Sequence, residues 1–367
     1  GLMTFVERNR GKGGNALSAT YRELAWVFGA AHNRPDRAIA TLREGIEECP
    51  ADPTISLALV KALRDVSAND KAIVEVRRLL GIDAWNANAW RALADVFRAT
   101  GEPDGAAIAL TPLVAMKQAT DAEIKTVRAR HTLVARAPSG ILGRQGLEQI
   151  IDHGALNETA TGLVHALADV LGKLEGFDHD RHGVSKRDRI RQGDPHPLRT
   201  FADRIGRVFG VPEYDLYVVG SSELDWAAVF PGSPPTLVVP TRLEDARDPV
   251  LAFALARPLA LMSRLLHPVD RIDPITLERI LVASVRHFEP GFALREDEPD
   301  LERETRRVGK AIGFFGRGRV QEAAASFATA PTRDVARWVR DVRRMAARAA
   351  LLVADDLLAA YEALGAD

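Results

Sequence analysis

The sequence contains a single cysteine, Cys49, among its 367 residues. One thiol excludes an internal disulfide framework and a zinc site made of several cysteines. The 49 basic residues nearly balance the 50 acidic ones, and the net charge of -1 provides no strong overall attraction to nucleic acid or to a membrane surface. No apolar stretch reaches the roughly 18 residues that a membrane-spanning helix needs, so we expect no membrane insertion.

Aromatic residues are scarce at 6%, whereas alanine, leucine and arginine are abundant, and this composition favours helices. The hydrophobic fraction of 46% is ordinary for a soluble globular protein with a sizeable core, and the length suggests two or three domains. Residues 1–10 lack the pattern of a signal peptide. The expected location is therefore the cytoplasm, although a signal peptide removed earlier would leave the same sequence.

The first third of the chain contains an internal repeat, in which similar residues recur every 34 positions along the sequence. Small or apolar residues recur at this step in four columns. The columns are Ala38, Ala72 and Ala106; Leu42, Val76 and Leu110; Ala25, Leu59 and Leu93; and Gly29, Leu63 and Phe97. A repeat of this length predicts stacked pairs of helices, because a single pair cannot bury its apolar face alone.

This pattern resembles the tetratricopeptide repeat, a helix-turn-helix unit of about 34 residues with small residues where its two helices cross. The resemblance covers about residues 19–118, with a weaker fourth unit over 121–151, so we assign residues 1–151 to a repeat domain. Pro50 closes the first unit, but the next two units lack that proline, and Gly45 stands where alanine is usual. The resemblance implies a right-handed α-solenoid whose inner groove is lined by the first helix of each pair.

The groove positions that the resemblance implies carry mostly polar side chains. They are Lys61, Arg64, Asn88, Arg91, Asp95 and Arg98. The cations among them can donate hydrogen bonds to a peptide carboxylate or an acidic segment, so other proteins or peptides are the expected partners. The alternative is that these residues form only solvated helix faces.

Residues 152–197 are predicted to connect the repeat domain to a second domain. Helices are expected over 142–153 and 158–174, followed by a polar loop broken by glycine and proline. The loop holds three histidines, His179, His182 and His196. They lack a recognised spacing of metal ligands, so we favour a solvated loop and expect no metal and no cofactor.

A short basic run, residues 186–191, lies in the same loop. It is interrupted by Asp188 and has no aromatic stacking platform nearby. We therefore expect no nucleic-acid partner.

Residues 198–367 are predicted to form a small α+β domain with two or three strands and C-terminal helices. Strands are expected over 215–219 and 235–240, the second one closing a hairpin. A long apolar helix follows to Leu266, and Asp248 is its expected N-cap. Further helices are expected over 273–287, 301–315, 320–328 and 332–364.

This order of elements resembles metallopeptidases of the gluzincin type. Active members carry H-E-x-x-H on the apolar helix, where two imidazoles bind zinc and the glutamate acts as general base. In this sequence the ligand positions fall on Arg257 and Leu261, and the base position falls on Pro258. None of these side chains can bind zinc or accept a proton. The resemblance therefore implies a peptidase-like domain without catalysis.

Pro258 has a further consequence, because a proline inside a helix costs about 3 kcal/mol. We expect tertiary packing to hold this helix, through Leu251, Leu255, Leu259, Met262 and Leu266. A kink that shapes a ligand cleft is the alternative. His267 and His287 are expected at the surface or at helix caps.

The sequence thus predicts a mainly α protein, with a solenoid followed by a small α+β domain. The favoured function is a non-catalytic scaffold of bacterial type that binds partner proteins through the solenoid groove. The alternatives are a metal-dependent peptidase or hydrolase that uses the histidine loop, and a sensor of a small ligand.

Overall fold

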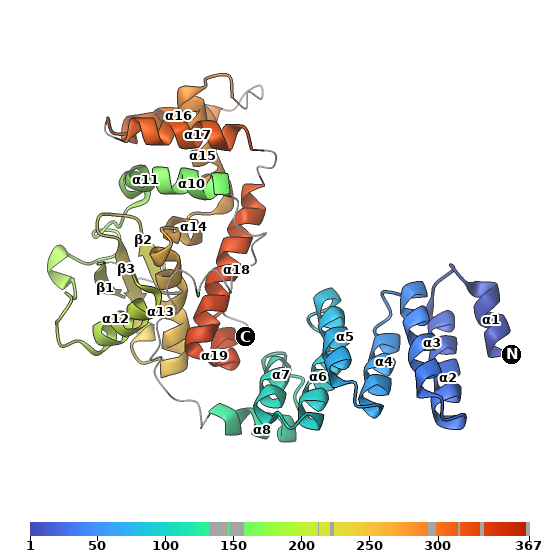
Figure 1. Ribbon diagram of the computed structural model, residues 1–367. Coiled ribbons are helices and arrows are strands. Elements are labelled where there is room, and N and C mark those ends of the chain that lie inside the picture. The colour runs from blue at the N-terminus through green and yellow to red at the C-terminus, as the bar shows by residue number, and fades with distance from the viewer. Residues whose placement is uncertain are drawn as a thin grey trace. The chain divides into compact units, whose positions relative to one another are not determined.

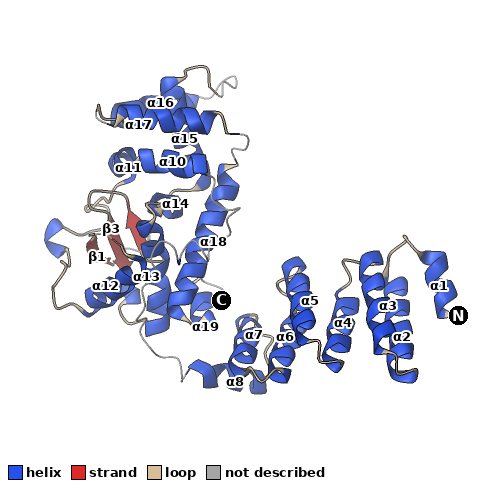
Figure 2. Ribbon diagram, in the orientation of Figure 1, coloured by secondary structure: helices blue, strands red, loops and turns tan. Residues whose placement is uncertain are grey.

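The computed structural model describes residues 1–131, 146, 158–211, 213–220, 224–292, 299–314, 316–330 and 334–364. The chain divides into two compact units, Gly1–Val134 and Ala135–Gly365. The described residues form 18 α-helices and one three-stranded sheet (Figures 1 and 2). The prediction of a mainly helical protein with a small β region is confirmed.

The first unit consists of a succession of helices. They are α1 (Leu2–Asn9), α2 (Asn15–Trp26) with a π-helical extension (Val27–Ala31), α3 (Pro35–Glu48), α4 (Pro53–Asp65), α5 (Asn69–Ile82), α6 (Ala87–Ala99), α7 (Pro103–Ala115) and α8 (Asp121–His131). Each helix from α2 to α8 packs against the next, and α4 also packs against α2 and α6. The helices α2, α4 and α6 therefore form one layer of the unit.

The helix starts repeat with the step found in the sequence. Helices α3, α5 and α7 begin at residues 35, 69 and 103, and α4, α6 and α8 begin at 53, 87 and 121, so both series advance by the same step. The turns before α3, α5 and α7 repeat as well. Asn33, Ser67 and Gly101 have φ values of 50°, 59° and 75°, a left-handed conformation that reverses the chain between two helices.

The apolar columns of the repeat form the core of this unit. Ala38, Ala72 and Ala106 are buried, and so are the residues of the Leu42 and Ala25 columns. Gly45 departs from the alanine of the repeat pattern for a steric reason. A Cβ at this position would lie 2.8 Å from Cγ of the buried Tyr21, so the close contact between α2 and α3 requires glycine.

The second unit combines helices with the sheet. Its elements are α10 (Glu158–Ala166), α11 (Ala168–Glu175), α12 (Pro197–Phe209), β1 (Asp215–Val219), β2 (Ala228–Phe230), β3 (Thr236–Pro240), α13 (Asp248–Ser263), α14 (His267–Arg271), α15 (Pro274–Phe288), α16 (Pro299–Ala311), α17 (Arg317–Ala328), α18 (Val335–Ala354) and α19 (Leu357–Ala363). Short 3₁₀ turns cover Lys186–Asp188 and Thr241–Leu243.

The sheet has the strand order β1-β3-β2. Strands β1 and β3 are parallel, with Tyr217 opposite Val238, and β2 and β3 form the expected antiparallel hairpin, with Val229 opposite Leu237. Side chains alternate between the two faces. One face joins the main core with α12 and α13, and the other packs against the loop that follows α11.

The helix α13 lies at the centre of the second unit and packs against α12, α14, α18 and α19. The five apolar residues expected to hold the helix around Pro258 are all buried. Two details differ from the prediction. Asp248 is the first helical residue rather than the N-cap, which is Arg247, and the helix ends at Ser263 because Leu265 adopts a left-handed φ of 56°.

Helices α10 and α11 do not form a connecting segment. Their apolar residues, including Leu163, Leu167 and Leu171, belong to the main core of the second unit. Helix α10 packs against α15 and α17, and α11 packs against α16. The apolar faces of α10 and α11 therefore pack against helices that are distant in the sequence, and a local sequence pattern does not show which helices these are. The predicted helix over 142–153 lies outside the described residues except for Gly146, as does the fourth repeat unit beyond residue 131.

Two further expectations for the second unit were wrong. His267 begins α14 and is buried, because α14 packs against α13, α18 and β2. The last helical stretch is broken in two at Asp355, whose φ is 48°, and the Asp356 carboxylate then accepts a hydrogen bond from the Ala359 amide at 2.8 Å to start α19. Of the helices in the described ranges, none combines the length and hydropathy required to span a membrane.

Candidate functional site

The predicted groove residues lie on α4 and α6, which begin at equivalent caps. The carboxylate of Asp52 accepts a hydrogen bond from the Thr54 amide at 2.8 Å, and the side chain of Asn86 accepts one from the Ala89 amide at 3.0 Å. Such caps satisfy amides that the helix leaves unpaired and set where the helix begins. Because the two caps are one repeat step apart, Arg64 and Arg98 have the same position on successive helices.

These two arginines share one carboxylate. Arg64 Nη1 lies 3.3 Å from Asp95 Oδ2, and Arg98 Nη1 lies 2.9 Å from Asp95 Oδ1. Asp95 and Arg98 are on α6, whereas Arg64 comes from α4, so the carboxylate links adjacent repeats. About half of the Asp95 side chain remains exposed. The pairs are therefore accessible to solvent, where ion pairs contribute at most about 1 kcal/mol each.

Arg91 forms a stronger contact one repeat further along. Its guanidinium donates to both oxygens of Glu123 on α8, at 2.8 and 3.2 Å, and to the carbonyl of Gln118 at 2.7 Å. These hydrogen bonds from Arg91 outweigh the effect of partial burial and lower the pKa of the Glu123 carboxyl to about 2. Glu123 was not among the predicted site residues.

A local sequence signal marks Glu123. The Thr120 amide donates to Glu123 Oε2 at 2.7 Å, and the Glu123 amide donates to Thr120 Oγ1 at 3.3 Å. This reciprocal pair is a capping box, whose T-x-x-E pattern is visible in the sequence. The pattern predicts the helix start, but it does not show that Arg91 on another helix reaches the same carboxylate.

The remaining predicted groove residues are more peripheral. Lys61 is exposed and lies 3.6 Å from Asp65 one turn later in α4, and Asn88 is exposed in the first turn of α6. The cations Lys61, Arg64, Arg91 and Arg98 thus each face a carboxylate of the same unit. A partner that binds this face has to compete with those carboxylates. Whether a partner binds there stays a prediction.

In the second unit, the three peptidase-motif positions lie on α13. Arg257 is mostly buried and forms an ion pair with Asp270 of α14, while Pro258 and Leu261 are buried in the core. Arg343 of α18 approaches the same carboxylate at 3.9 Å, and its Nη2 donates to the carbonyl of Asp270 at 3.0 Å. The charged groups near the motif position therefore connect α13, α14 and α18.

His179 and His182 of the loop after α11 lie together against Phe177, so the prediction of a solvated loop is wrong for this part of it. His182 is buried and its ring stacks on Phe177 with the centroids 5.2 Å apart, while His179 Nε2 lies 3.2 Å from the Tyr217 hydroxyl. Both rings cover one face of the sheet. His196 is at the start of α12, where its Nε2 lies 3.9 Å from Glu244. Three His, Cys, Asp or Glu side chains positioned to hold a metal ion are not found within the described part of the chain.

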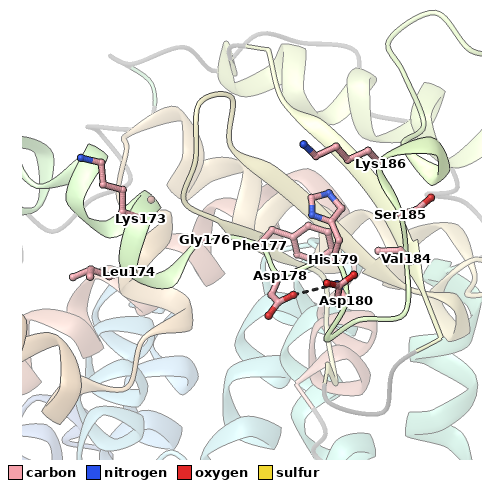
Figure 3. A pocket seen from close by; sticks show the side chains of 11 residues that line it. Lys173, Leu174, Gly176, Phe177, Asp178, His179, Asp180, Val184, Ser185 and Lys186 are labelled. Carbon is pink, nitrogen blue, oxygen red and sulfur yellow. Dashed lines mark hydrogen bonds between the residues drawn. The ribbon is translucent and has the colours of Figure 1, made fainter. Parts of the chain in front are cut away.

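A pocket of about 590 Å3 opens beside this loop (Figure 3). Lys173 and Leu174 of α11 lie on one side of it, and Val184 to Lys186 lie on the other. Several of its polar groups are already engaged. Lys173 Nζ donates to the Ala311 carbonyl at 2.8 Å, and Asp178 accepts from the Asp180 amide at 3.1 Å. The pocket is open and polar. The Lys173 bond joins α11 to α16 and the Asp178 bond holds the loop, so these groups do not converge on a point.

The fold and these sites define a two-unit, mainly helical protein with a charged repeat face in one unit and a small sheet in the other. Comparisons of the chain with protein-family profiles, with curated proteins and with solved structures found no match.

Proposed function

We propose that the chain is a non-catalytic scaffold that binds partner proteins through its first unit, as a solenoid of the tetratricopeptide type. The internal repeat supports this proposal, since one step governs the helix starts, the left-handed turns and the two caps. A solenoid of this kind presents one layer of helices as an extended binding surface. Here that layer includes α4 and α6.

The observation that carries the proposal is the position of Asp95 between Arg64 and Arg98. Two guanidiniums from adjacent repeats form ion pairs with one carboxylate, and about half of that carboxylate's side chain is exposed to solvent. An acidic side chain or a chain-terminal carboxylate of a peptide can replace Asp95 at these donors. Because exposed ion pairs are weak, the exchange costs little, and guanidinium groups suit carboxylates geometrically. The proposed partner is therefore an extended peptide with acidic groups.

The second unit is proposed to be a degenerate peptidase-like domain with a role in assembly. The side chains of α13 support this proposal. Arg257 and Leu261 occupy the positions of the two zinc-binding imidazoles in the resembling family, and Arg257 is engaged by Asp270. A guanidinium offers no lone pair to a metal. The charged cluster instead links three helices of the core.

The test is a charge reversal in the groove with a matched control. Arg64→Glu together with Arg98→Glu should abolish capture of acidic peptides from an immobilised peptide library. Arg43→Glu together with Arg77→Glu is the control, since these exposed arginines are also one repeat step apart but lie on α3 and α5. Unchanged capture by the groove variant, or equal loss in both variants, would contradict the assigned groove.

A second measurement addresses the alternative of a metal-dependent hydrolase. Elemental analysis of the purified protein should show no stoichiometric zinc. Stoichiometric zinc that survives dialysis would overturn the non-catalytic assignment of the second unit and would leave the groove proposal to be judged by the peptide experiment alone.

A further inference from the structure

The segment from Thr305 to Gln321 differs in charge from the rest of the protein. It contains five basic residues and no acidic residue, whereas the whole chain has a net charge of -1. The five are Arg306, Arg307, Lys310, Arg317 and Arg319. The segment comprises the second half of α16, the following turn and the start of α17. Helices α16 and α17 form one end of the second unit (Figure 1).

The basic residues of α16 lie on the face opposite the core, whereas the Glu304 side chain of the same helix is mostly buried. Leu301, Val308 and Ala311 of this helix are buried. The basic residues are at positions 303, 306, 307 and 310, a spacing that places them together on the outer side of a helix. Arg307 is engaged by Glu175 at 3.0 Å and by Glu304 at 3.1 Å. Arg303 pairs with Asp300 at 2.6 Å. Arg306 and Lys310 are exposed to solvent.

The turn after α16 carries an exposed aromatic side chain. Phe314 is 87% exposed, and glycines lie close to it on either side, at Gly313 and Gly316. Lys173 of α11 lies next to this turn, because a Cβ added to Gly313 would be 3.9 Å from Lys173 Nζ. Arg319 is exposed in the first turn of α17. An apolar ring is thus presented among cations from three elements.

The arrangement suits a surface that offers both negative charge and an apolar layer. Cations attract anionic headgroups and each contributes about 1 kcal/mol near such a surface, while an exposed aromatic ring inserts at the boundary with the acyl chains. A nucleic acid would use the cations, but a single ring on a turn provides no series of stacking positions. A protein segment made of acidic residues alone would leave the ring without an apolar contact.

We propose that this basic tip, composed of Lys173, Arg306, Lys310, Phe314, Arg317 and Arg319, binds peripherally to an anionic lipid surface. The cations contact the headgroups, and Phe314 enters the interface without any segment crossing the membrane. This binding is independent of the peptide groove proposed for the first unit. It would bring the scaffold and its partners to a membrane.

Vesicle sedimentation tests the proposal on the full chain. The protein should sediment with vesicles of phosphatidylcholine and phosphatidylserine, and not with vesicles of phosphatidylcholine alone. Lys310→Gln together with Arg319→Gln should lower the partition coefficient about 30-fold at low ionic strength, which corresponds to two surface cations. Phe314→Ser should lower it about tenfold, and added salt should weaken the binding of the wild type.

The control is Arg340→Gln together with Arg348→Gln, which removes the same charge from exposed positions of α18. It should bind vesicles like the wild type, and circular dichroism should show that all variants are folded. Equal losses in the control and the tip variant, or no preference for phosphatidylserine, would overturn the proposal. Binding to a DNA duplex that is lost in the tip variant, without binding to vesicles, would overturn it in favour of a nucleic acid.

A spectroscopic measurement distinguishes insertion from simple charge attraction. Cys49 is buried, so a thiol placed at Phe314→Cys can be labelled selectively with an environment-sensitive fluorophore. Its emission should shift to the blue when phosphatidylserine vesicles are added. An unchanged emission spectrum on vesicles that bind the protein would show that position 314 stays in water, contrary to the proposal.

Discussion

Arg64 and Arg98, which occupy equivalent positions in successive repeats, hold the same carboxylate, that of Asp95. The carboxylate keeps two cations of adjacent repeats close together. If the proposed acidic partner binds these cations, it competes with Asp95. The first prediction follows from this relationship.

Asp95→Asn should tighten the binding of acidic peptides, because the two guanidiniums lose their internal carboxylate. Stability should fall by less than about 2 kcal/mol, since Asp95 forms two pairs and both are exposed. Fluorescence polarisation with a labelled acidic peptide measures the affinity. The control is Asp36→Asn, which removes an exposed carboxylate that faces Arg34 outside the predicted groove. Weaker peptide binding by Asp95→Asn would mean that this carboxylate contacts the partner.

The pair of Arg91 and Glu123 predicts a dependence on pH. Arg91 lowers the pKa of Glu123 from 4.5 to about 2. A carboxyl whose pKa is lower in the folded state stabilises the fold above its unfolded pKa, and this contribution is lost as the pH falls from about 4.5 to about 2. Amide hydrogen exchange of α8 should therefore be faster in Glu123→Gln than in the wild type at neutral pH.

The size of this effect is about 1–2 kcal/mol of local stability once solvent screening is allowed for. The difference between Glu123→Gln and the wild type should shrink as the pH approaches 2. A difference that is the same at neutral and acidic pH would show that the charge of Glu123 is not its cause. Glu75→Gln is a suitable comparison, because Glu75 and Arg78 form an ion pair within α5, which does not include α8.

Gly45→Ala should destabilise the first unit although alanine favours helices more than glycine does. The added Cβ would lie 2.8 Å from Cγ and 2.9 Å from Cβ of Tyr21, which is fully buried and cannot move away easily. Overpacking of this kind costs about 1–3 kcal/mol. Gly81→Ala is the matched control on α5, where a Cβ meets nothing within 4 Å, and it should add up to about 1 kcal/mol. Thermal unfolding followed by circular dichroism compares the two variants, and a stable Gly45→Ala would contradict the packing argument.

Asp270→Ala should destabilise the second unit by about 2–3 kcal/mol, because losing one partner of a buried ion pair leaves the other charge desolvated. It leaves Arg257, which is mostly buried, without its carboxylate, and it also removes the charge that faces Arg343. Hydrogen exchange in α13 and α14 reports the change. Asp300→Ala is the control, because it breaks an ion pair with Arg303 in which both side chains are exposed. It should lower the stability by less than about 0.5 kcal/mol. Equal losses of stability in the two variants would contradict the claim that burial makes the Asp270 pair more important.

The sequence was most informative in the repeat region of the first unit. Helices and turns of similar length follow one another there, so residues of one column lie on the same face of successive helices. The columns of Ala38 and Leu42 therefore indicated the core directly. The hairpin of β2 and β3 was also predictable, since its strands are separated by a short turn that contains proline and glycine. The parallel pairing of β1 with β3 was not predicted, because parallel strands are joined through a longer connection.

The candidate site was only partly predictable for a related reason. The sequence indicated which residues of α4 and α6 share one face, but the carboxylates that engage them come from other turns or other helices. Glu123 reaches Arg91 across 32 residues, and Asp95 reaches Arg64 across 31. Periodicity describes the phase within a helix and carries no information about which side chains meet between helices.

By itself, the sequence determined that this protein is mainly helical, that its first third is an internal repeat with one constant step, and that Arg257, Pro258 and Leu261 offer no side chain that binds zinc. These properties depend on residue type and on spacing along the chain. Only the tertiary structure decided that α10 and α11 belong to the second core, that His267 is buried, and that Asp95 is shared by two arginines. Those outcomes depend on packing between distant segments, where many arrangements satisfy the same local pattern and the buried contacts select one.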